Sequence, residues 1–276
     1  MLMSFKICPA RSGPDNEASA VSNLFARPTH FTEIDSTNRY LADRARAGDP
    51  EGGVAIADMQ SAGRGRLGRS WVSAPQSSLL CSMLFRPSLA LGEFHLVMTT
   101  VALGARQAID ELAGITVSLK WPNDLLVDDK KVAGLLAEIV ETDSGNALIV
   151  GIGINLQWPE GRAPRDLASD TDDLGSRATT LLEASGRLID RDLLASSMLE
   201  HIERDYSRLA DVKFRSDLMQ RYREVLDTLG RRVRIEQRSR TYEADAIGVT
   251  DAGYLQIQEG TEVREIDAAD VIHLRH

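Results

Sequence analysis

The densest group of residues that could do chemistry is a loop at residues 60–71, which reads QSAGRGRLGRSW. Gly63, Gly65 and Gly68 match the G-x-G-x-x-G spacing of nucleotide-binding loops, a pattern that is weak by itself. Arginines occupy positions between these glycines, and their forked guanidinium groups bind phosphate through charge-assisted hydrogen bonds. The loop therefore favours binding of a polyphosphate, although a solvated basic loop has the same composition.

Two better-known uses of this glycine pattern do not fit the surrounding sequence. In a dinucleotide-binding fold the glycines open a helix, whereas residues 70–75 show no helical periodicity. A protein kinase needs a VAIK lysine, an HRD loop and a DFG motif, and the chain contains none of these. Trp71 is either a core residue or a surface on which a purine stacks.

Three further segments place polar residues at the ends of apolar stretches. Residues 120–124 read KWPND, and Lys131 opens the apolar stretch after the next turn. A lysine there suits a carboxylate or phosphate ligand, whereas an Asn-Asp pair after a proline is also ordinary turn chemistry. Residues 151–155, GIGIN, either allow a ligand close to the backbone or form a plain buried strand. Residues 35–38, DSTN, are by themselves a helix cap.

The periodicity of apolar residues predicts the elements that must position these segments. Apolar runs predict strands at residues 54–57, 79–85, 117–120, 125–127, 131–140 and 147–155. Helical spacing predicts helices at residues 93–112, 191–209 and 215–226, with a short helix after DSTN. Short polar turns join the strands between residues 117 and 155, which predicts an antiparallel meander rather than a doubly wound parallel sheet.

The expected fold is α+β, with a mixed, largely antiparallel sheet, flanking helices and a small C-terminal five-stranded β-barrel. The barrel is predicted from five short strands after residue 229, which are joined by turns. We expect a mobile N-terminal tail (1–28), a catalytic domain (29–228) and the barrel (229–276). The tail is expected because its residues are largely small and polar.

Composition excludes several classes of function. The 276 residues include 32 Lys and Arg against 41 Asp and Glu, and the resulting net charge of −9 opposes non-specific binding to nucleic acid. Cys8 and Cys81 show no ligand spacing, which excludes a disulfide scaffold and a structural zinc site. No signal peptide or membrane helix is expected, so we predict a cytoplasmic protein.

Taken together and in this order, five segments resemble the biotin protein ligases: DSTN, QSAGRGRLGRSW, KWPNDLL, KKVAGLLAE (130–138) and GIGIN. The resemblance covers roughly residues 30–275. It implies a class II synthetase-like catalytic domain of the biotin–lipoate ligase type. It also implies that biotin is activated with ATP and magnesium as biotinyl-5'-AMP and then transferred to a lysine of a biotin carboxyl carrier domain. An arginine loop without structure of its own is expected to close over this intermediate and exclude water.

The resemblance further implies a role for each matching residue. The expected biotin-binding residues are Ser36, Thr37, Asn38, Gln60, Gly63, Arg64, Gly65, Arg66, Lys131 and Gly134. The expected ATP- and adenylate-binding residues are Arg64, Arg66, Arg69, Trp71, Asn123, Lys131 and Asn155. Lys131, Arg66 and Asp124 are the expected catalytic residues, and Asp124 would face the incoming amine. Magnesium is expected to arrive with ATP near Asn155, with no direct protein ligand assigned.

Three other functions are less consistent with the sequence. A bifunctional ligase and operon repressor needs a helix-turn-helix, whereas the residues before Asp35 are polar and rich in Pro and Gly. A non-catalytic binding module is disfavoured because the arginines, Lys131 and Asp124 are intact. A lipoate ligase is not expected to have the GRGRxGR loop. The expected partner is therefore a carrier domain of a carboxylase. We expect no specific DNA binding and no membrane binding. The protein is expected to be a monomer or weak homodimer.

Overall fold

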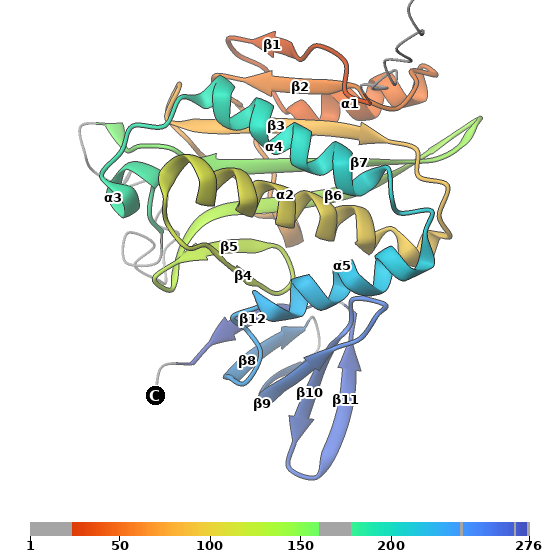
Figure 1. Cartoon of the computed structure of the whole chain (residues 1–276), viewed down its shortest axis with the longest axis vertical. Helices are drawn as coiled ribbons and strands as arrows, with labels where there is room; N and C mark the ends of the chain where they lie inside the picture. Colours follow the sequence, from red (N-terminus) through yellow and green to blue (C-terminus); the bar gives the residue numbers. More distant parts are fainter. Residues whose placement is uncertain (1–23, 160–177, 238–239, 268, 275–276) are drawn as a thin grey trace, which may run out of the picture.

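A seven-stranded mixed sheet forms the centre of the computed structural model, which describes residues 24–159, 178–237, 240–267 and 269–274 (Figure 1). Its strands follow the order β1-β2-β3-β7-β6-β5-β4. They are β1 (Thr29–Phe31), β2 (Val54–Ala57), β3 (Ser78–Phe85), β4 (Ser118–Lys120), β5 (Asp124–Val127), β6 (Lys130–Thr142) and β7 (Gly145–Asn155). Only the β1–β2 pair is parallel, so the largely antiparallel sheet expected from the sequence is confirmed.

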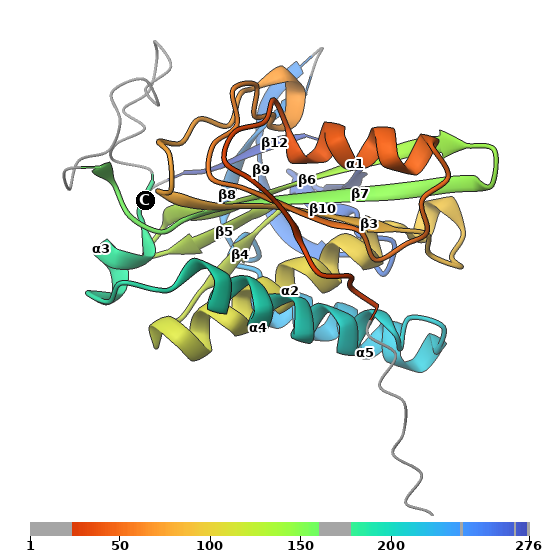
Figure 2. The same ribbon diagram turned by 90° about the horizontal axis from the view of Figure 1, so that it is seen from above.

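The helices cover the two faces of this sheet unequally (Figure 2). One face carries α2 (His95–Ala113), α4 (Arg191–Tyr206) and α5 (Val212–Glu224), and the other carries α1 (Thr37–Arg46). The short helix α3 (Leu181–Ser185) precedes α4. Gly114 ends α2 in a left-handed conformation, which a residue without a side chain adopts readily. The side chain of Ser36 caps α1, as expected from DSTN.

The end of the expected N-terminal tail is ordered against the sheet. The ring of Phe25 packs edge-on against Phe85 with 5.8 Å between centroids, and Ala26 N donates to Gly52 O. The prediction of a mobile tail up to residue 28 is therefore wrong for residues 24–28, because Leu24 and Phe25 pack against core side chains. Residues 1–23 lie outside the described residues.

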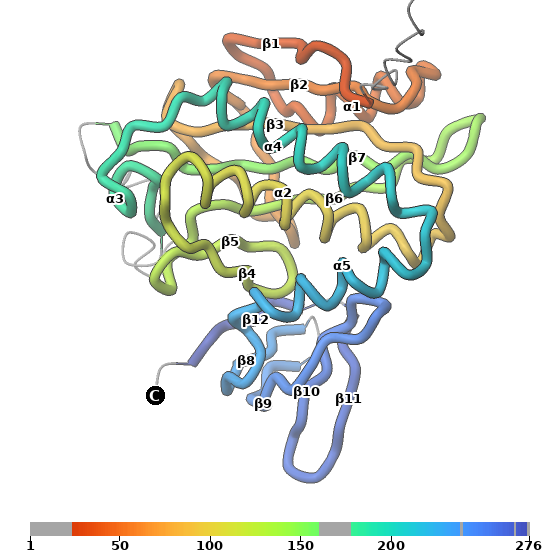
Figure 3. The backbone as a smooth tube through the Cα atoms, viewed as in Figure 1, coloured from red at the N-terminus to blue at the C-terminus, as the bar shows by residue number. Residues whose placement is uncertain are grey.

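Five strands form a second sheet after residue 229, as predicted. They are β8 (Arg232–Gln237), β9 (Arg240–Val249), β10 (Leu255–Glu259), β11 (Glu262–Ile266) and β12 (Asp270–His273), in the order β11-β10-β9-β8-β12. Among the described residues β11 and β12 do not pair, so this is an antiparallel sheet with two edges rather than a closed barrel. Figure 3 shows the β10–β11 hairpin extending away from the large sheet, which separates the two edge strands.

Trp121 connects the two sheets. Its ring nitrogen donates to Gly253 O over 3.0 Å, and its backbone N donates to Thr228 Oγ1 over 2.9 Å. The indole is buried, so this contact anchors the C-terminal sheet beside the segment that reads KWPND. No helix within the described ranges is long and apolar enough to cross a membrane.

Candidate active site

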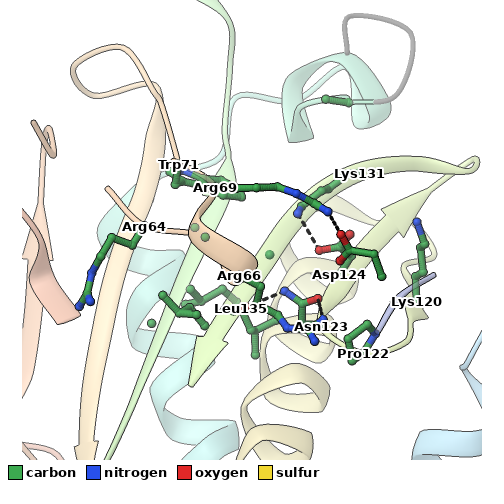
Figure 4. Close-up of a pocket in the computed structure, with 18 of the residues that line it drawn as sticks. Arg64, Arg66, Arg69, Trp71, Lys120, Pro122, Asn123, Asp124, Lys131 and Leu135 are labelled. Atoms are coloured by element: carbon green, nitrogen blue, oxygen red, sulfur yellow. Dashed lines mark hydrogen bonds and ion pairs between the residues drawn. The ribbon is translucent and has the colours of Figure 1, made fainter. Parts of the chain in front are cut away.

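A cleft of about 1000 Å³ lies between the large sheet, the arginine loop and the C-terminal sheet (Figure 4). The structure brings most of the predicted site residues to its wall: Ser36, Thr37, Asn38, Gln60, Arg64, Gly65, Arg66, Arg69, Trp71, Asn123, Asp124, Lys131 and Gly134. These residues are separated by up to a hundred positions in the sequence. Their convergence depends on β3, β6 and β7 being adjacent in the sheet.

An ion pair between Lys131 and Asp124 lies in the wall of this cleft. Lys131 Nζ is 2.6 Å from Asp124 Oδ1, and their side chains are 35% and 20% exposed. The two residues come from paired strands, since Asp124 in β5 is opposite Gly134 in β6. Lys131 Nζ also lies 5.5 Å from the ring centroid of Trp71, within cation–π range. The lysine therefore faces the cleft with one carboxylate and one aromatic neighbour.

The indole of Trp71 lies on two glycines that are opposite each other in β6 and β7. A Cβ atom on Gly153 would be 2.4 Å from Trp71 Cε2, and one on Gly134 would be 3.1 Å from Trp71 Cζ3. Gly153 of GIGIN and Gly134 of KKVAGLLAE thus make room for this ring, whereas Gly151 of GIGIN lies against Asn38. Trp71 Nε1 is buried without a hydrogen-bond partner in the described part of the chain, an arrangement that proteins normally avoid.

The arginine loop has more structure than the sequence predicted. Trp71 N donates to Gly63 O and Gly65 N to Arg69 O, over 2.9 and 2.7 Å, around a short 3-10 turn at Arg66–Gly68. A Cβ atom on Gly63 would be 2.3 Å from the carbonyl oxygen of Trp71, so this close turn requires glycine. The expectation of a loop without structure of its own is therefore wrong, because the loop makes its own backbone hydrogen bonds.

The three arginines of the loop have different partners. Arg64 Nη2 donates to Glu138 Oε2 over 2.7 Å, and Arg66 Nη1 donates to Asn123 Oδ1 over 3.2 Å. Arg69 forms an ion pair with the carboxylate of Asp270 in β12, so the loop also contacts the C-terminal sheet.

Partial burial changes the pKa of the Arg66 guanidinium. Its pKa is lowered by loss of hydration and by nearby Arg69, and this is partly offset by Asp124. A half-buried guanidinium of this kind gains strongly from an anion placed beside it.

A chain of hydrogen bonds occupies the end of the cleft nearest α1. Gln60 Oε1 accepts from Thr37 N over 2.7 Å, and Thr37 Oγ1 lies 2.7 Å from Ser82 Oγ. Ser82 Oγ donates to Asn38 Oδ1 over 2.6 Å, and Asn38 Nδ2 donates to Glu138 Oε2 over 2.8 Å. Sequence reasoning missed Ser82 and Glu138, because each lies in an apolar strand without a signal of its own.

Two predicted residues do not reach the cleft wall. Asn155 is buried, and its Nδ2 donates to Thr179 O over 3.1 Å. Gly63 faces the backbone of the loop, as described above. The C-terminal sheet, to which the sequence assigned no site residue, contributes several polar and charged residues to the wall: Arg234, Glu236, Asp270 and His273, with Arg231 just before β8.

In the described part of the chain, the one cluster of candidate metal ligands is already paired with a cation. In the described ranges, the candidate ligand atoms of Asp129, Asp227 and His273 lie close together. Arg231 Nη2, however, donates to both carboxylates over 2.9 and 2.7 Å, and so supplies the positive charge between them. Burial lowers the pKa of His273 to about 4, assisted by the positive charges of Lys120 and Arg231. The amide of Asn155, near which magnesium was expected, already donates a hydrogen bond to Thr179 O.

Comparison with known proteins identifies the family. Residues 31–155 match the biotin/lipoate A/B protein ligase family, and residues 228–274 match the biotin protein ligase C-terminal domain. The chain is 30% identical to a biotin–[acetyl-CoA-carboxylase] ligase of Mycobacterium tuberculosis, over 95% of this chain and 97% of that protein. The chain belongs to the biotin protein ligase family. It is also 30% identical to the bifunctional ligase/repressor BirA of Bacillus subtilis, over 86% of this chain and 71% of that protein.

Solved structures of biotin protein ligases have the same fold. The Aquifex aeolicus enzyme in complex with biotin and ATP is 27% identical, with a TM-score of 0.77, and the match covers 91% of this chain and 100% of that chain. The Leishmania major enzyme in complex with biotinyl-5-AMP is 23% identical, with a TM-score of 0.59 and coverage of 87% and 98%. The family expected from the sequence is thus confirmed, and so is the fold, except that the C-terminal sheet is not a closed barrel.

Proposed function

We propose that this protein activates biotin with ATP as biotinyl-5'-AMP and transfers the biotinyl group to a lysine of a biotin carboxyl carrier domain. One observation carries the proposal. The Lys131–Asp124 ion pair shares a cleft with the half-buried Arg66 and with Trp71 on its two glycines. The site therefore combines cations for two substrate anions, an aromatic surface and a carboxylate for an amine.

In the first half-reaction, a carboxylate oxygen of biotin attacks the α-phosphorus of ATP, and the bond from that phosphorus to the pyrophosphate oxygen breaks. Both reactants are anions, so fixed cations are needed to bring them together. We infer that the biotin carboxylate replaces Asp124 as the partner of Lys131. The guanidinium of Arg66, which donates to the neutral Asn123, would gain most from a phosphate oxygen.

The nucleotide would bind on the side of the cleft formed by the loop and the C-terminal sheet. The adenine would contact Trp71, whose unpartnered Nε1 can donate to a ligand acceptor. Arg69 would exchange Asp270 for the phosphates. Magnesium would enter as part of the ATP substrate, because Mg²⁺ commonly keeps its waters and binds through substrate phosphates.

In the second half-reaction, the lysine nitrogen of the carrier attacks the acyl carbon, the bond from that carbon to the AMP oxygen breaks, and the amine loses a proton. Asp124 would orient the incoming ammonium group and accept that proton, once biotin has replaced it beside Lys131. The same carboxylate is thus used twice, first as the partner of a cation and then as a base.

Biotin's ureido ring would bind at the opposite end of the cleft, among Ser36, Thr37, Asn38 and Gln60. Their oxygens and amides offer both donors and acceptors, which such a ring requires. Together with Gly65, Gly134 and Arg64, these residues complete the proposed biotin site. A cytoplasmic monomer or weak homodimer without specific DNA binding completes the proposal. The net charge of −9 opposes non-specific binding to DNA.

The decisive experiment is incubation with ATP, magnesium, biotin and a biotin carboxyl carrier domain, followed by intact-mass measurement of the carrier. We expect one added biotinyl group, which disappears when ATP is omitted or when the acceptor lysine of the carrier is replaced by arginine. Lipoate in place of biotin should leave the carrier unmodified. An unmodified carrier in the complete mixture would contradict the proposal. A mobility-shift assay with the gene's own promoter tests the repressor alternative.

A further inference from the structure

Glu138 of β6 forms the charged end of the hydrogen-bonded chain beside α1. Its Oε2 accepts from Asn38 Nδ2 over 2.8 Å and from Arg64 Nη2 over 2.7 Å. Asn38 and Ser82 are buried, while the side chain of Glu138 is 28% exposed. One carboxylate thus holds both the start of the arginine loop and the amide that continues the chain into the cleft.

The negative charge of Glu138 determines the direction of this chain. A carboxylate only accepts, so the nitrogen of Asn38 must face it and the oxygen of Asn38 must face Ser82. Ser82 donates its one hydrogen to Asn38 over 2.6 Å. The 2.7 Å contact between Ser82 Oγ and Thr37 Oγ1 then requires the hydrogen of Thr37. No hydroxyl hydrogen is left for the 3.0 Å contact between Thr37 Oγ1 and Gln60 Oε1.

The cleft end of the chain is therefore one hydrogen short. Three oxygen–oxygen contacts of 2.6–3.0 Å link Gln60, Thr37, Ser82 and Asn38 in sequence. Only the hydroxyl groups of Thr37 and Ser82 supply hydrogens to them, so two hydrogens serve three contacts. A bound ring that brings its own N–H supplies the missing donor to Thr37 or Gln60. The ureido ring of biotin carries two such groups, whereas the dithiolane ring of lipoate carries none. Binding of lipoate would leave these acceptor oxygens unpaired, which would lower the affinity for lipoate.

We propose that Glu138 is a positioning residue that makes the site selective for an N–H-bearing ring, and so for biotin over lipoate. It does so by directing the hydrogens of Asn38, Ser82 and Thr37 away from the ligand. The inference rests on the proposed function, because it assumes that the ring binds at this end of the cleft.

The test compares Glu138→Leu, Glu138→Gln and Glu141→Leu in acid-dependent exchange of pyrophosphate into ATP, with biotin and with lipoate. Glu141 is exposed on the same strand, so its replacement is the matched control. In Glu138→Leu the amide of Asn38 can turn over, and we expect the KM for biotin to rise on the order of tenfold, the loss of about one hydrogen bond. The preference for biotin over lipoate should fall by a similar factor, while kcat at saturating biotin changes little. Glu138→Gln keeps an acceptor oxygen for Asn38 and should recover most of the preference.

Ser82→Ala gives an independent test that leaves Glu138, Asn38 and Arg64 in contact. It should lower the preference for biotin over lipoate in the same way, because it cuts the chain next to Thr37. Circular dichroism establishes that each variant is folded. An unchanged KM for biotin and an unchanged preference in either folded variant, Glu138→Leu or Ser82→Ala, would overturn the inference and leave the proposed function intact. A wild-type protein without biotin-dependent exchange would instead overturn the proposed function, and this inference with it.

Discussion

Lys131 Nζ lies 2.6 Å from Asp124 Oδ1, and the two residues belong to neighbouring strands of the same meander. Both side chains are partly exposed to the cleft, so the pair is held by the sheet but open to exchange with a ligand. A substrate carboxylate has the same chemistry as Asp124 and can take its place. The pair therefore gives the two residues separate roles in two successive steps.

Lys131→Ala should weaken biotin activation. The variant removes the cation that opposes two anions, and the transition state should lose about 2–4 kcal/mol if the loss resembles that of an oxyanion donor. The measurement is biotin-dependent exchange of pyrophosphate into ATP. The nearby Lys130→Ala, on an exposed neighbouring residue, is the control. Exchange in Lys131→Ala within about twofold of wild type would argue against this role.

Asp124→Asn should separate the two half-reactions. Biotin is already ionised at neutral pH, so adenylate formation needs no base, whereas attack by the carrier amine does. We expect pyrophosphate exchange to survive while biotin transfer to the carrier falls. Both rates are measured on the same preparation. Equal loss of both would mean that Asp124 acts only by holding Lys131.

Arg66→Gly should let the adenylate escape. A phosphate contact to this half-buried guanidinium would hold the loop over the intermediate, so removal of the guanidinium should release the reactive anhydride to lysines in solution. The measurement is biotin incorporated into a bystander protein relative to the carrier. Leu67→Gly is the matched control, since it places a glycine in the same turn, at an exposed residue with φ of 55°. No rise in relative bystander labelling in Arg66→Gly would disprove a retaining role.

Gly153→Ala should displace Trp71 and raise the KM for ATP severalfold. The added methyl group would lie 2.4 Å from Trp71 Cε2, a distance that the ring can avoid only by moving. Gly92→Ala has no atom within 4 Å of the new Cβ and serves as the control. Tryptophan fluorescence and steady-state kinetics test this together. An unchanged KM for ATP would indicate that the nucleotide does not depend on the position of this ring.

His273 should make stability depend on pH between about 6.5 and 4. Its pKa is about 4 in the folded chain, against an ordinary value of 6.5, so the unfolded state binds more protons in this window. The stabilisation is complete above pH 6.5 and is lost as the pH falls towards 4, by at most about 3 kcal/mol. His273→Gln, which can still pair with Thr228, should flatten the urea-unfolding free energy over this range. Equal slopes for the two proteins would refute the assignment.

The sequence by itself determined the family, most of the elements and most members of the site. Strands and helices followed from apolar periodicity, and the short polar turns between residues 117 and 155 required antiparallel pairing. Most cleft residues could be predicted because they belong to short sequence motifs, and each motif can be identified from consecutive residues alone. Lys131 and Asp124 were expected in one cleft for this reason, and the structure places them in contact.

Only the tertiary structure decided which side chains complete those motifs. Glu138 and Ser82 have no local signal, and they meet Asn38 only because α1 packs across β3 and β6. Gly153 and Gly134 accommodate Trp71 because the β6–β7 register places these two glycines opposite each other. Asp270 reaches Arg69 only when the C-terminal sheet docks on the catalytic domain. These contacts join residues far apart in the chain, so strand register and packing, rather than local pattern, determine them.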